Sequence, residues 1–383
     1  MAGNLRGSVE ASVAAVGAAA AAAAAADEVH DVVIVGSGPA AHTAAIYTAR
    51  AGLRPVLYEG MVSLDLTPGG QLTTTTGGEV RLTPPTPIPH PTPQNYPGFP
   101  RGVGGLELVE LLTAQSKQFG TRVVGETIGR VDFTARPLTL WPAGDGAAPV
   151  RARAVIIATG ATPRKLDVPG SSTYWQAGIS TCATCDGAAP RFRRQVVLVV
   201  GGGDTACEEV LHLARTASRV VLVHRRDALR ASKIMADRVL ATPNISVAWD
   251  SVVEEAVGDA AGGMSGARLR NVKTGVTEVV AARGLFYAIG HIPTTAFLGG
   301  ALALDAEGCI VTTPAMTTSV PGVFAAGDVQ DRHYRQAITA AASGCVAALE
   351  AERWLALGGD GAMGGVPAPV PVPVPVAGGE AKM

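Results

Sequence analysis

The sequence has few cysteines, little net charge and no strongly apolar run, and each shortage excludes a class of protein. Five cysteines in 383 residues are too few for a disulfide-stapled secreted domain, and Cys207, Cys309 and Cys345 stand alone. A formal net charge of -1 does not favour nucleic acid or an anionic membrane as a partner. The run 11–26 is mostly alanine and is too short and too weakly apolar to predict a membrane span.

The two ends of the chain differ in composition from the rest. The alanine-rich leader, residues 1–27, has one arginine, Arg6, and an acidic Glu10, whereas organellar transit peptides are rich in arginine and poor in acidic residues. This favours the cytoplasm, with a mitochondrion or plastid, reached through the leader, as the alternative. The tail, residues 358–383, is rich in proline, glycine and valine, and we expect it to be disordered.

A glycine-rich turn stands between a predicted strand at 31–35 and a predicted helix that runs to Ala51. In the pattern Gly36-x-Gly38-x-x-Ala41, the first glycine makes the turn and the second lets a pyrophosphate approach the start of the helix. Glu59, at the end of the next predicted strand, can accept hydrogen bonds from ribose hydroxyls. The arrangement predicts a dinucleotide site, and a merely structural turn is the alternative.

The same unit is repeated in the middle of the chain. Gly201-x-Gly203-x-x-Ala206 follows a predicted strand at 196–200 and opens a helix expected to reach about Ala217. The next predicted strand, 220–223, ends in a basic cluster where a carboxylate would otherwise sit. Guanidinium groups bind a 2'-phosphate through charge-assisted hydrogen bonds, so the pattern predicts NADPH rather than NADH, and a solvated basic turn is the alternative. The cluster consists of His224, Arg225, Arg226 and, nearby, Arg230.

Cys182 and Cys185 are separated by two residues, a spacing that allows a disulfide to open and close. Half of a zinc site is the alternative, but a structural zinc needs four ligands and the chain has no second CxxC and no His-x(3-5)-His pair. Asp186 could exchange the proton that the dithiol needs, or cap a helix. We expect Cys207 and Cys345 to be small core residues.

Other segments give coarser predictions. The segment 83–93 has proline at nearly every second position and is expected to form an extended loop. Residues 154–158, 280–290 and 322–328 are predicted strands that lead into glycine turns, and 335–355 is a predicted alanine-rich helix.

From about Asp31 to Leu355 the chain resembles the low-molecular-weight NADPH-dependent thioredoxin reductases of the plant and fungal cytosolic kind. The motifs that carry the resemblance occur in family order and include GSGPAAHTAAIY, GGQLTTTT, NYPGFP, CATCDGAAP, GGGDTACEE, HRRDALRAS and VFAAGDVQD. The resemblance implies an α/β flavoprotein with two Rossmann-like dinucleotide-binding domains, one for FAD and one for NADPH. It also implies a homodimer and thioredoxin as the protein partner.

The resemblance also implies where the domains divide. The FAD domain would be discontinuous, with residues 28–164 as its first part and 292–357 as its second, and the NADPH domain would be residues 165–291. The proline-rich segment 77–94 has no counterpart in the family and separates two FAD-side positions; because loops tolerate added length cheaply, we expect it to loop outward. Rotation between the domains is expected about hinges near 160–163 and 290–293.

The family's site residues transfer to matching positions of this chain. NADPH would reduce FAD, FAD would reduce the Cys182–Cys185 disulfide, Cys182 would attack oxidised thioredoxin, and Cys185 would lie against the flavin. A non-enzymatic NADPH-binding protein that has lost its flavin stays open as an alternative. The expected FAD contacts are Gly36, Ser37, Gly38, Pro39, Ala40, Glu59, Gln71, Asn95, Ile128, Asp328, Arg335, Gln336 and Ala337. The expected NADPH contacts are Gly201, Gly203, Asp204, Thr205, His224, Arg225, Arg226 and Arg230.

Overall fold

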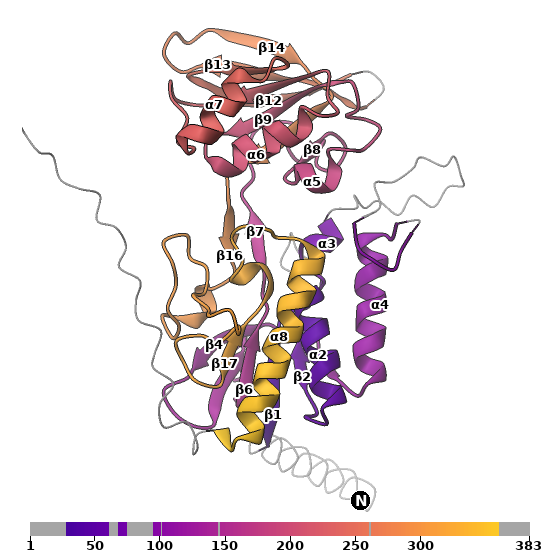
Figure 1. Cartoon of the computed structure of the whole chain (residues 1–383), viewed down its shortest axis with the longest axis vertical. Coiled ribbons are helices and arrows are strands. Elements are labelled where there is room, and N and C mark those ends of the chain that lie inside the picture. The colour runs from indigo at the N-terminus through magenta and orange to yellow at the C-terminus, as the bar shows by residue number, and fades with distance from the viewer. Residues whose placement is uncertain are drawn as a thin grey trace, which may run out of the picture.

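The structure is a computed structural model that describes residues 28–60, 68–74, 95–100, 102–144, 146–259 and 262–359. These residues form two α/β bodies, one above the other in Figure 1. The terminal body contains residues 28–160 and 294–359, from both ends of the described chain, and the central body contains residues 164–290. The leader, the insertion 77–94 and the tail from residue 360 lie outside the described residues.

The terminal body is built on a seven-stranded sheet. Its central strands are parallel and β-branched, and they are buried on both faces, as expected for strands covered on each side. The last strand along the chain pairs with a strand from the first part, Val323 beside Val155, so both parts share one sheet. In sheet order the strands are β3 (Arg122–Val124), β2 (Val56–Tyr58), β1 (Val29–Val35), β6 (Val150–Ile157), β5 (Leu138–Pro142) and β4 (Ile128–Asp132), with β17 (Val323–Ala325) beside β6.

Helices α2 (Pro39–Arg50), α4 (Gly105–Gln118) and α8 (Ala337–Ala356) lie side by side on the terminal body in Figure 1. The contact between α2 and α8 is made by alanine and glycine, which let the two backbones come close. A Cβ added at Gly344 of α8 would lie 2.2 Å from the carbonyl oxygen of Ala40. No helix in the described part of the chain is long and apolar enough to cross a membrane.

The central body has a five-stranded parallel sheet and a smaller antiparallel sheet of three strands. The larger sheet is β11 (Ile245–Ala248), β10 (Arg219–Val223), β9 (Val196–Gly201), β15 (Gly284–Ala288) and β8 (Ile179–Ser180). The smaller sheet is β12 (Ser251–Gly258), β13 (Met264–Asn271) and β14 (Thr277–Ala281). The helices are α5 (Ala183–Asp186), α6 (Asp204–Leu213) and α7 (Lys233–Ala241).

Four sequence predictions about these elements need correction. The strand predicted at 322–328 is shorter, because β17 ends at Ala325 and a 3-10 helix follows at Gly327–Val329. The single strand predicted at 280–290 is wrong, because β14 ends at Ala281 in the antiparallel sheet and β15 starts at Gly284 in the parallel one. Helix α6 ends at Leu213, four residues before the predicted end. Helix α8 starts at Ala337 rather than at Arg335, because Arg335 has a φ of 46° and cannot continue into a right-handed helix.

A short antiparallel ribbon joins the two bodies (Figure 1). Strand β7 (Ala161–Pro163) pairs with β16 (His291–Pro293), and a glycine with positive φ precedes each strand, Gly160 at 69° and Gly290 at 93°. Glycine adopts such angles without the steric penalty that other residues meet. The two predicted hinge segments therefore lie next to each other.

Candidate active site

A cavity of about 780 Å³ lies between the two bodies. The terminal body contributes the turn after β1, the ends of β2 and β6, the short helix α3 (Gln71–Thr74), the 3-10 helix η2 (Gly327–Val329) and the start of α8. The central body contributes α5 and parts of α6 and α7. Residues from distant parts of the sequence therefore form one site.

The first fingerprint turn opens into this cavity. A Cβ at Gly36, which has a φ of 131°, would lie 2.2 Å from the carbonyl oxygen of Ala158, so a side chain cannot fit there. Gly38 has no atom within 4 Å of the Cβ position, and no side chain caps the helix that follows it. The helix start is therefore open to an anion. Ser37 accepts a hydrogen bond from the backbone amide of Gly69 at 2.8 Å and holds the next wall of the cavity in place.

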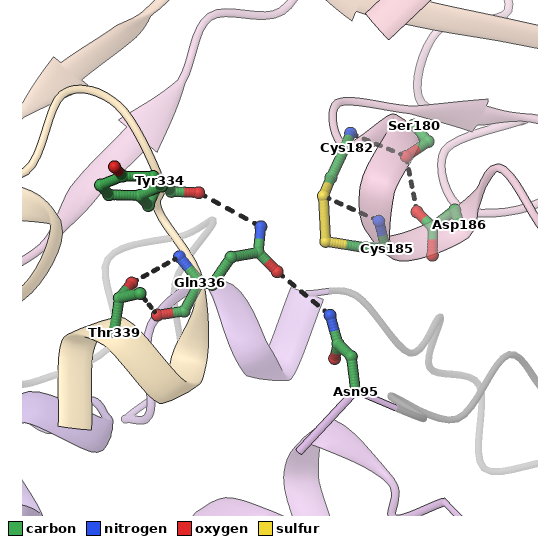
Figure 2. Close-up of a disulfide and its surroundings, with 8 residues drawn as sticks. All are labelled: Asn95, Ser180, Cys182, Cys185, Asp186, Tyr334, Gln336 and Thr339. Atoms are coloured by element: carbon green, nitrogen blue, oxygen red, sulfur yellow. Dashed lines mark hydrogen bonds between the residues drawn. A yellow bond between two sulfur atoms is a disulfide. The ribbon is translucent and has the colours of Figure 1, made fainter. Parts of the chain in front are cut away.

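Several polar side chains face the same space. Asn95 donates a hydrogen bond from Nδ2 to Oε1 of Gln336 at 3.1 Å, and Figure 2 shows this pair near the disulfide. Gln336 also donates from Nε2 to the Tyr334 carbonyl at 3.2 Å. Of the residues predicted to hold FAD, these line the cavity: Gly36, Ser37, Gly38, Pro39, Ala40, Glu59, Gln71, Asn95, Ile128, Asp328, Arg335, Gln336 and Ala337.

Asp328 and Arg335 give one wall of the cavity unusual electrostatics. Burial raises the pKa of Asp328 to about 7, although the positive charge of Arg335 acts to lower it. The buried Nε of Arg335 has no hydrogen-bond partner among the described residues, while its Nη1 lies 3.2 Å from Nδ1 of His291. Burial lowers the pKa of His291 to about 4, so this imidazole is neutral at pH 7. This wall therefore has a hydrogen-bond donor, the Nε of Arg335, from which no described residue accepts.

The cysteine pair lies on the opposite wall. Cys182 is the extended residue before α5, and it forms a disulfide with Cys185 of the same short helix. Its Sγ also accepts a hydrogen bond from the Cys185 amide at 3.1 Å (Figure 2). Because the two sulfurs are bonded to each other, neither is a thiolate available to a metal. The redox interpretation of the pair matches this geometry.

Asp186 ends α5 and is buried beside the disulfide. The hydroxyl of Ser180 donates to its Oδ2 at 2.5 Å and accepts from the Cys182 amide at 3.1 Å, as Figure 2 shows. Burial raises the pKa of Asp186, and the Ser180 hydrogen bond opposes that shift. The carboxyl does not cap the start of the helix; it is linked through Ser180 to the backbone of Cys182.

The second fingerprint turn lies on the central body and is mostly outside the lining of the cavity. A Cβ at Gly201 would come within 2.5 Å of the Ala206 Cβ, whereas the Cβ position of Gly203 is open. Asp204 accepts hydrogen bonds from the amide and hydroxyl of Ser232 at 2.9 and 2.8 Å, which holds the following basic loop against the turn. Of the predicted NADPH contacts, Thr205 is the one that lines the cavity.

The basic cluster at the end of β10 divides into two kinds of residue. His224 is buried, and its two ring nitrogens lie 2.8 and 2.9 Å from the backbone oxygens of Gly201 and Ala228, so the ring supports the turn. Arg225 and Arg226 are exposed, and neither guanidinium has an ion pair or side-chain hydrogen bond within the described ranges. Arg230, also exposed, donates its amide to the Gly202 carbonyl at 2.7 Å and brings a third guanidinium to this region.

Comparisons with known proteins agree with this arrangement. A family model described as "Pyridine nucleotide-disulphide oxidoreductase" matches residues 30–344. A thioredoxin reductase of Penicillium chrysogenum is 52% identical over 332 residues, which is 85% of this chain and 95% of that protein. The chain belongs to the thioredoxin reductases.

Other thioredoxin reductases are similar to the chain in sequence and in structure. "Thioredoxin reductase 1, mitochondrial" of Arabidopsis thaliana is 51% identical over 86% of this chain and 85% of that protein. The solved thioredoxin reductase of Giardia duodenalis is 39% identical and covers 86% of this chain and all of that one, with a TM-score of 0.76. The predicted fold class and oxidoreductase activity are confirmed, and so are FAD and NADPH, the cofactors that this family uses.

Sequence reasoning missed several residues at the thioredoxin reductase site. Ser180 and Glu209 contact the redox helix, but neither belongs to a glycine or cysteine motif. His291 was noticed only as part of a hinge, although it meets Arg335 at the cavity. The acidic doublet Glu208-Glu209, one helical turn after the second fingerprint, was the one available signal. Of the two other cysteines expected in the core, Cys207 is buried as predicted, whereas Cys345 is only half-buried.

Proposed function

We propose that the chain is an NADPH-dependent thioredoxin-disulfide reductase whose Cys182–Cys185 pair passes two electrons to a disulfide of thioredoxin. The observation that carries the proposal is the position of this disulfide on the wall of the cavity that the first fingerprint also lines. The substrate follows from the family to which the chain belongs, because the similar proteins are named thioredoxin reductases.

The residues around the cavity fit FAD. The open start of α2 at Gly38 suits a pyrophosphate, and Glu59 suits ribose hydroxyls. The unpartnered Nε of Arg335 and the buried, readily protonated Asp328 supply a donor and a second hydrogen-bonding group for the polar parts of the flavin. We therefore assign the FAD-side residues predicted from the sequence to this cavity.

NADPH is assigned to the second fingerprint. Gly203 leaves the start of α6 open to a pyrophosphate, and Arg225, Arg226 and Arg230 would hold the 2'-phosphate. His224 contributes by fixing the turn, since both of its ring nitrogens lie at hydrogen-bond distance from backbone carbonyls. Because most of this turn lies outside the cavity lining, we propose that the central body rotates about the β7–β16 ribbon during turnover.

When bound, FAD supplies the electron pair that opens the disulfide. The thiolate of Cys182 then attacks a sulfur of oxidised thioredoxin, and Cys185 resolves the mixed disulfide, which restores the Cys182–Cys185 bond and releases the thioredoxin dithiol. Asp186 exchanges a proton with the pair, aided by the raised pKa of its buried carboxyl. Thioredoxin has a potential near about -270 mV, so the dithiol must have a similar or lower one.

Oligomeric state and compartment are part of the same proposal. We propose a homodimer formed through the helical layer of the terminal body, where Tyr47 of α2, Leu111 of α4 and Leu349 of α8 are exposed apolar side chains. Sedimentation should then give twice the chain mass of 38.8 kDa. We propose a cytoplasmic location because the leader is poor in arginine; similar proteins include mitochondrial forms, and imaging of a tagged full-length chain would decide.

The experiment that tests the proposal uses the purified protein with NADPH and oxidised thioredoxin. We expect bound flavin in the absorbance spectrum and continued NADPH oxidation only in the presence of thioredoxin, since without it consumption stops once the flavin and the disulfide are reduced. A colourless protein would support the alternative of an NADPH-binding protein without flavin. A flavoprotein that oxidises NADPH at the same rate without thioredoxin would exclude the proposed substrate.

A further inference from the structure

A second carboxyl, with one buried oxygen, lies beside the redox helix. Glu209 belongs to α6, which packs against α5, and its side chain lines the same cavity as the disulfide. It accepts a hydrogen bond from the backbone amide of Ala183, the residue that directly follows Cys182. The carboxyl is thereby held next to the residue that would attack the substrate.

The other oxygen of this carboxyl is unusual. Oε2 of Glu209 is buried and has no hydrogen-bond partner among the residues that the structure describes. Burying a charged carboxylate oxygen that receives no hydrogen bond costs free energy. The neutral, protonated carboxyl costs less and needs only an acceptor for its proton. Burial, with a smaller contribution from the neighbouring Glu208, raises the pKa of Glu209 to about 8. The carboxyl is therefore mostly protonated at pH 7 in the disulfide state, and its proton lacks an acceptor.

Reduction of the disulfide creates that acceptor. Opening the bond leaves negative charge on sulfur within one residue of the Ala183 amide, where the carboxyl is already fixed. Resting on the proposed function, we propose that Glu209 is a second acid–base residue of the dithiol. It gives its proton to sulfur when the disulfide opens and takes a proton from Cys182 when that thiol attacks thioredoxin.

The proposed steps balance. The reduced flavin of the proposed reaction supplies two electrons, the S–S bond breaks, and two sulfurs gain one proton from Glu209 and one from Asp186 or solvent. In the second half, the Cys182 proton returns to Glu209 as its sulfur bonds to thioredoxin, and the thioredoxin sulfur that leaves takes a proton from solvent. Cys185 then returns its proton to Asp186 or solvent and attacks Cys182, which breaks the mixed disulfide, and the second thioredoxin sulfur leaves and takes a proton from solvent. Glu209 ends each cycle protonated, as it began.

Other charged groups lie near the Glu209 carboxyl, and their effect on its pKa has to be considered. The titratable or charged side chains that line the cavity from the adjacent elements are Asp186 on α5, Glu208 and His212 on α6, Arg215 just after α6, and Arg238 on α7. Among them, Glu208 is the one that raises the pKa of Glu209. Burial lowers the pKa of His212, and Arg215 lowers it further, so His212 does not supply a positive partner at pH 7.

Glu209→Gln tests the proposal, because glutamine can still accept from the Ala183 amide but cannot carry or release the proton. The holoenzyme is reduced with dithiothreitol, the reductant is removed without admitting oxygen, and the alkylation rate of Cys182 by iodoacetamide is followed by mass spectrometry from pH 5 to 10. In the parent, the thiol and the carboxyl share protons and should titrate in two steps. The variant should show one step and react about threefold faster at pH 9, because a neighbouring negative charge has been removed.

The same variant should turn over more slowly, although its Cys182 is alkylated faster. At pH 7 the Glu209→Gln variant should reduce thioredoxin about tenfold more slowly, with Asp186 still in place. A structural defect is not expected to make Cys182 more reactive and the enzyme slower at the same time. Glu278→Gln, an exposed carboxyl on β14, is the matched control and should behave as the parent in both assays. Glu209→Ala should repeat both effects if the glutamine variant does not fold with FAD.

Identical alkylation profiles for the parent and both Glu209 variants would overturn the proposal, as would unchanged turnover at every pH. The alkylation assay needs no thioredoxin. A parent enzyme that shows two titration steps but does not reduce thioredoxin would therefore refute the proposed substrate and leave the assignment of Glu209 standing.

Discussion

At the scale of single residues, burial decides which carboxyl groups of the cavity can hold a proton. Burial raises the pKa of Asp186, of Glu209 and of Asp328, although each has a different neighbour: a serine hydroxyl, a backbone amide and an arginine. All three carboxyl groups line the same cavity.

Asp328→Asn should change how the stability of FAD-free protein depends on pH. The pKa of Asp328 is about 7 in the folded chain and about 3.9 when unfolded, so its stabilisation is complete below about pH 4 and is lost as the pH rises to 7. Between pH 4 and pH 7, the free energy of unfolding should fall more steeply with pH in the parent than in the variant. The two slopes should differ by at most about 1.4 kcal/mol per pH unit. Urea titrations at several pH values measure this, and equal slopes would refute it.

At the scale of elements, the end of strand β10 carries one buried basic residue and two exposed ones. His224 is turned inward to hold the glycine turn, while Arg225 and Arg226 are exposed. The sequence shows three basic residues in a row and cannot tell these roles apart. Only the packing of the strand against the turn decides which side chain remains free.

Arg225→Ala combined with Arg226→Ala should reduce the preference for NADPH over NADH. Each charge-assisted hydrogen bond to a phosphate is worth about 1.5 to 3 kcal/mol, so losing two should raise the KM for NADPH about 100-fold, less at high salt. The KM for NADH should barely change, because NADH has no 2'-phosphate. Steady-state kinetics with both nucleotides measure this, and an unchanged NADPH to NADH ratio would show that the cluster is a solvated turn.

Gly344→Ala should destabilise the terminal body. The added Cβ would meet the carbonyl oxygen of Ala40 at 2.2 Å, so α2 and α8 would have to move apart. Such overpacking costs about 1 to 3 kcal/mol, although alanine is the better helix former. Thermal unfolding measures the loss. Ala342→Ser, on the exposed side of the same helix, is the control and should stay within about 0.5 kcal/mol of the parent.

The sequence predicted those elements that are determined by local patterns. The two strand–turn–helix units and the cysteine pair could be recognised because glycine, β-branched runs and CxxC spacing have direct local consequences. The division of 280–290 between two sheets could not, because it depends on which neighbours each half meets. Glu209 was missed for the same reason: its role comes from contact with α5, which is distant in sequence.

At the scale of the whole molecule, the ribbon of β7 and β16 connects the two bodies while the cavity lies between them. The disulfide is on the central body, whereas the first fingerprint is on the terminal body, so the redox pair meets the cavity only because of how the bodies are placed. In this arrangement most of the second fingerprint lies outside the cavity lining. The proposed rotation about the ribbon would bring the two proposed nucleotide sites into use in turn.

The central claim is that electrons from NADPH reach thioredoxin through Cys182 and Cys185. The most direct test is to measure, without oxygen, how many thioredoxin disulfides are opened per NADPH consumed by the parent, Cys182→Ser and Cys185→Ser enzymes. We predict one per NADPH for the parent and none above background for either variant, with FAD content unchanged in all three. Thioredoxin reduction by either serine variant at the parent rate would contradict the account.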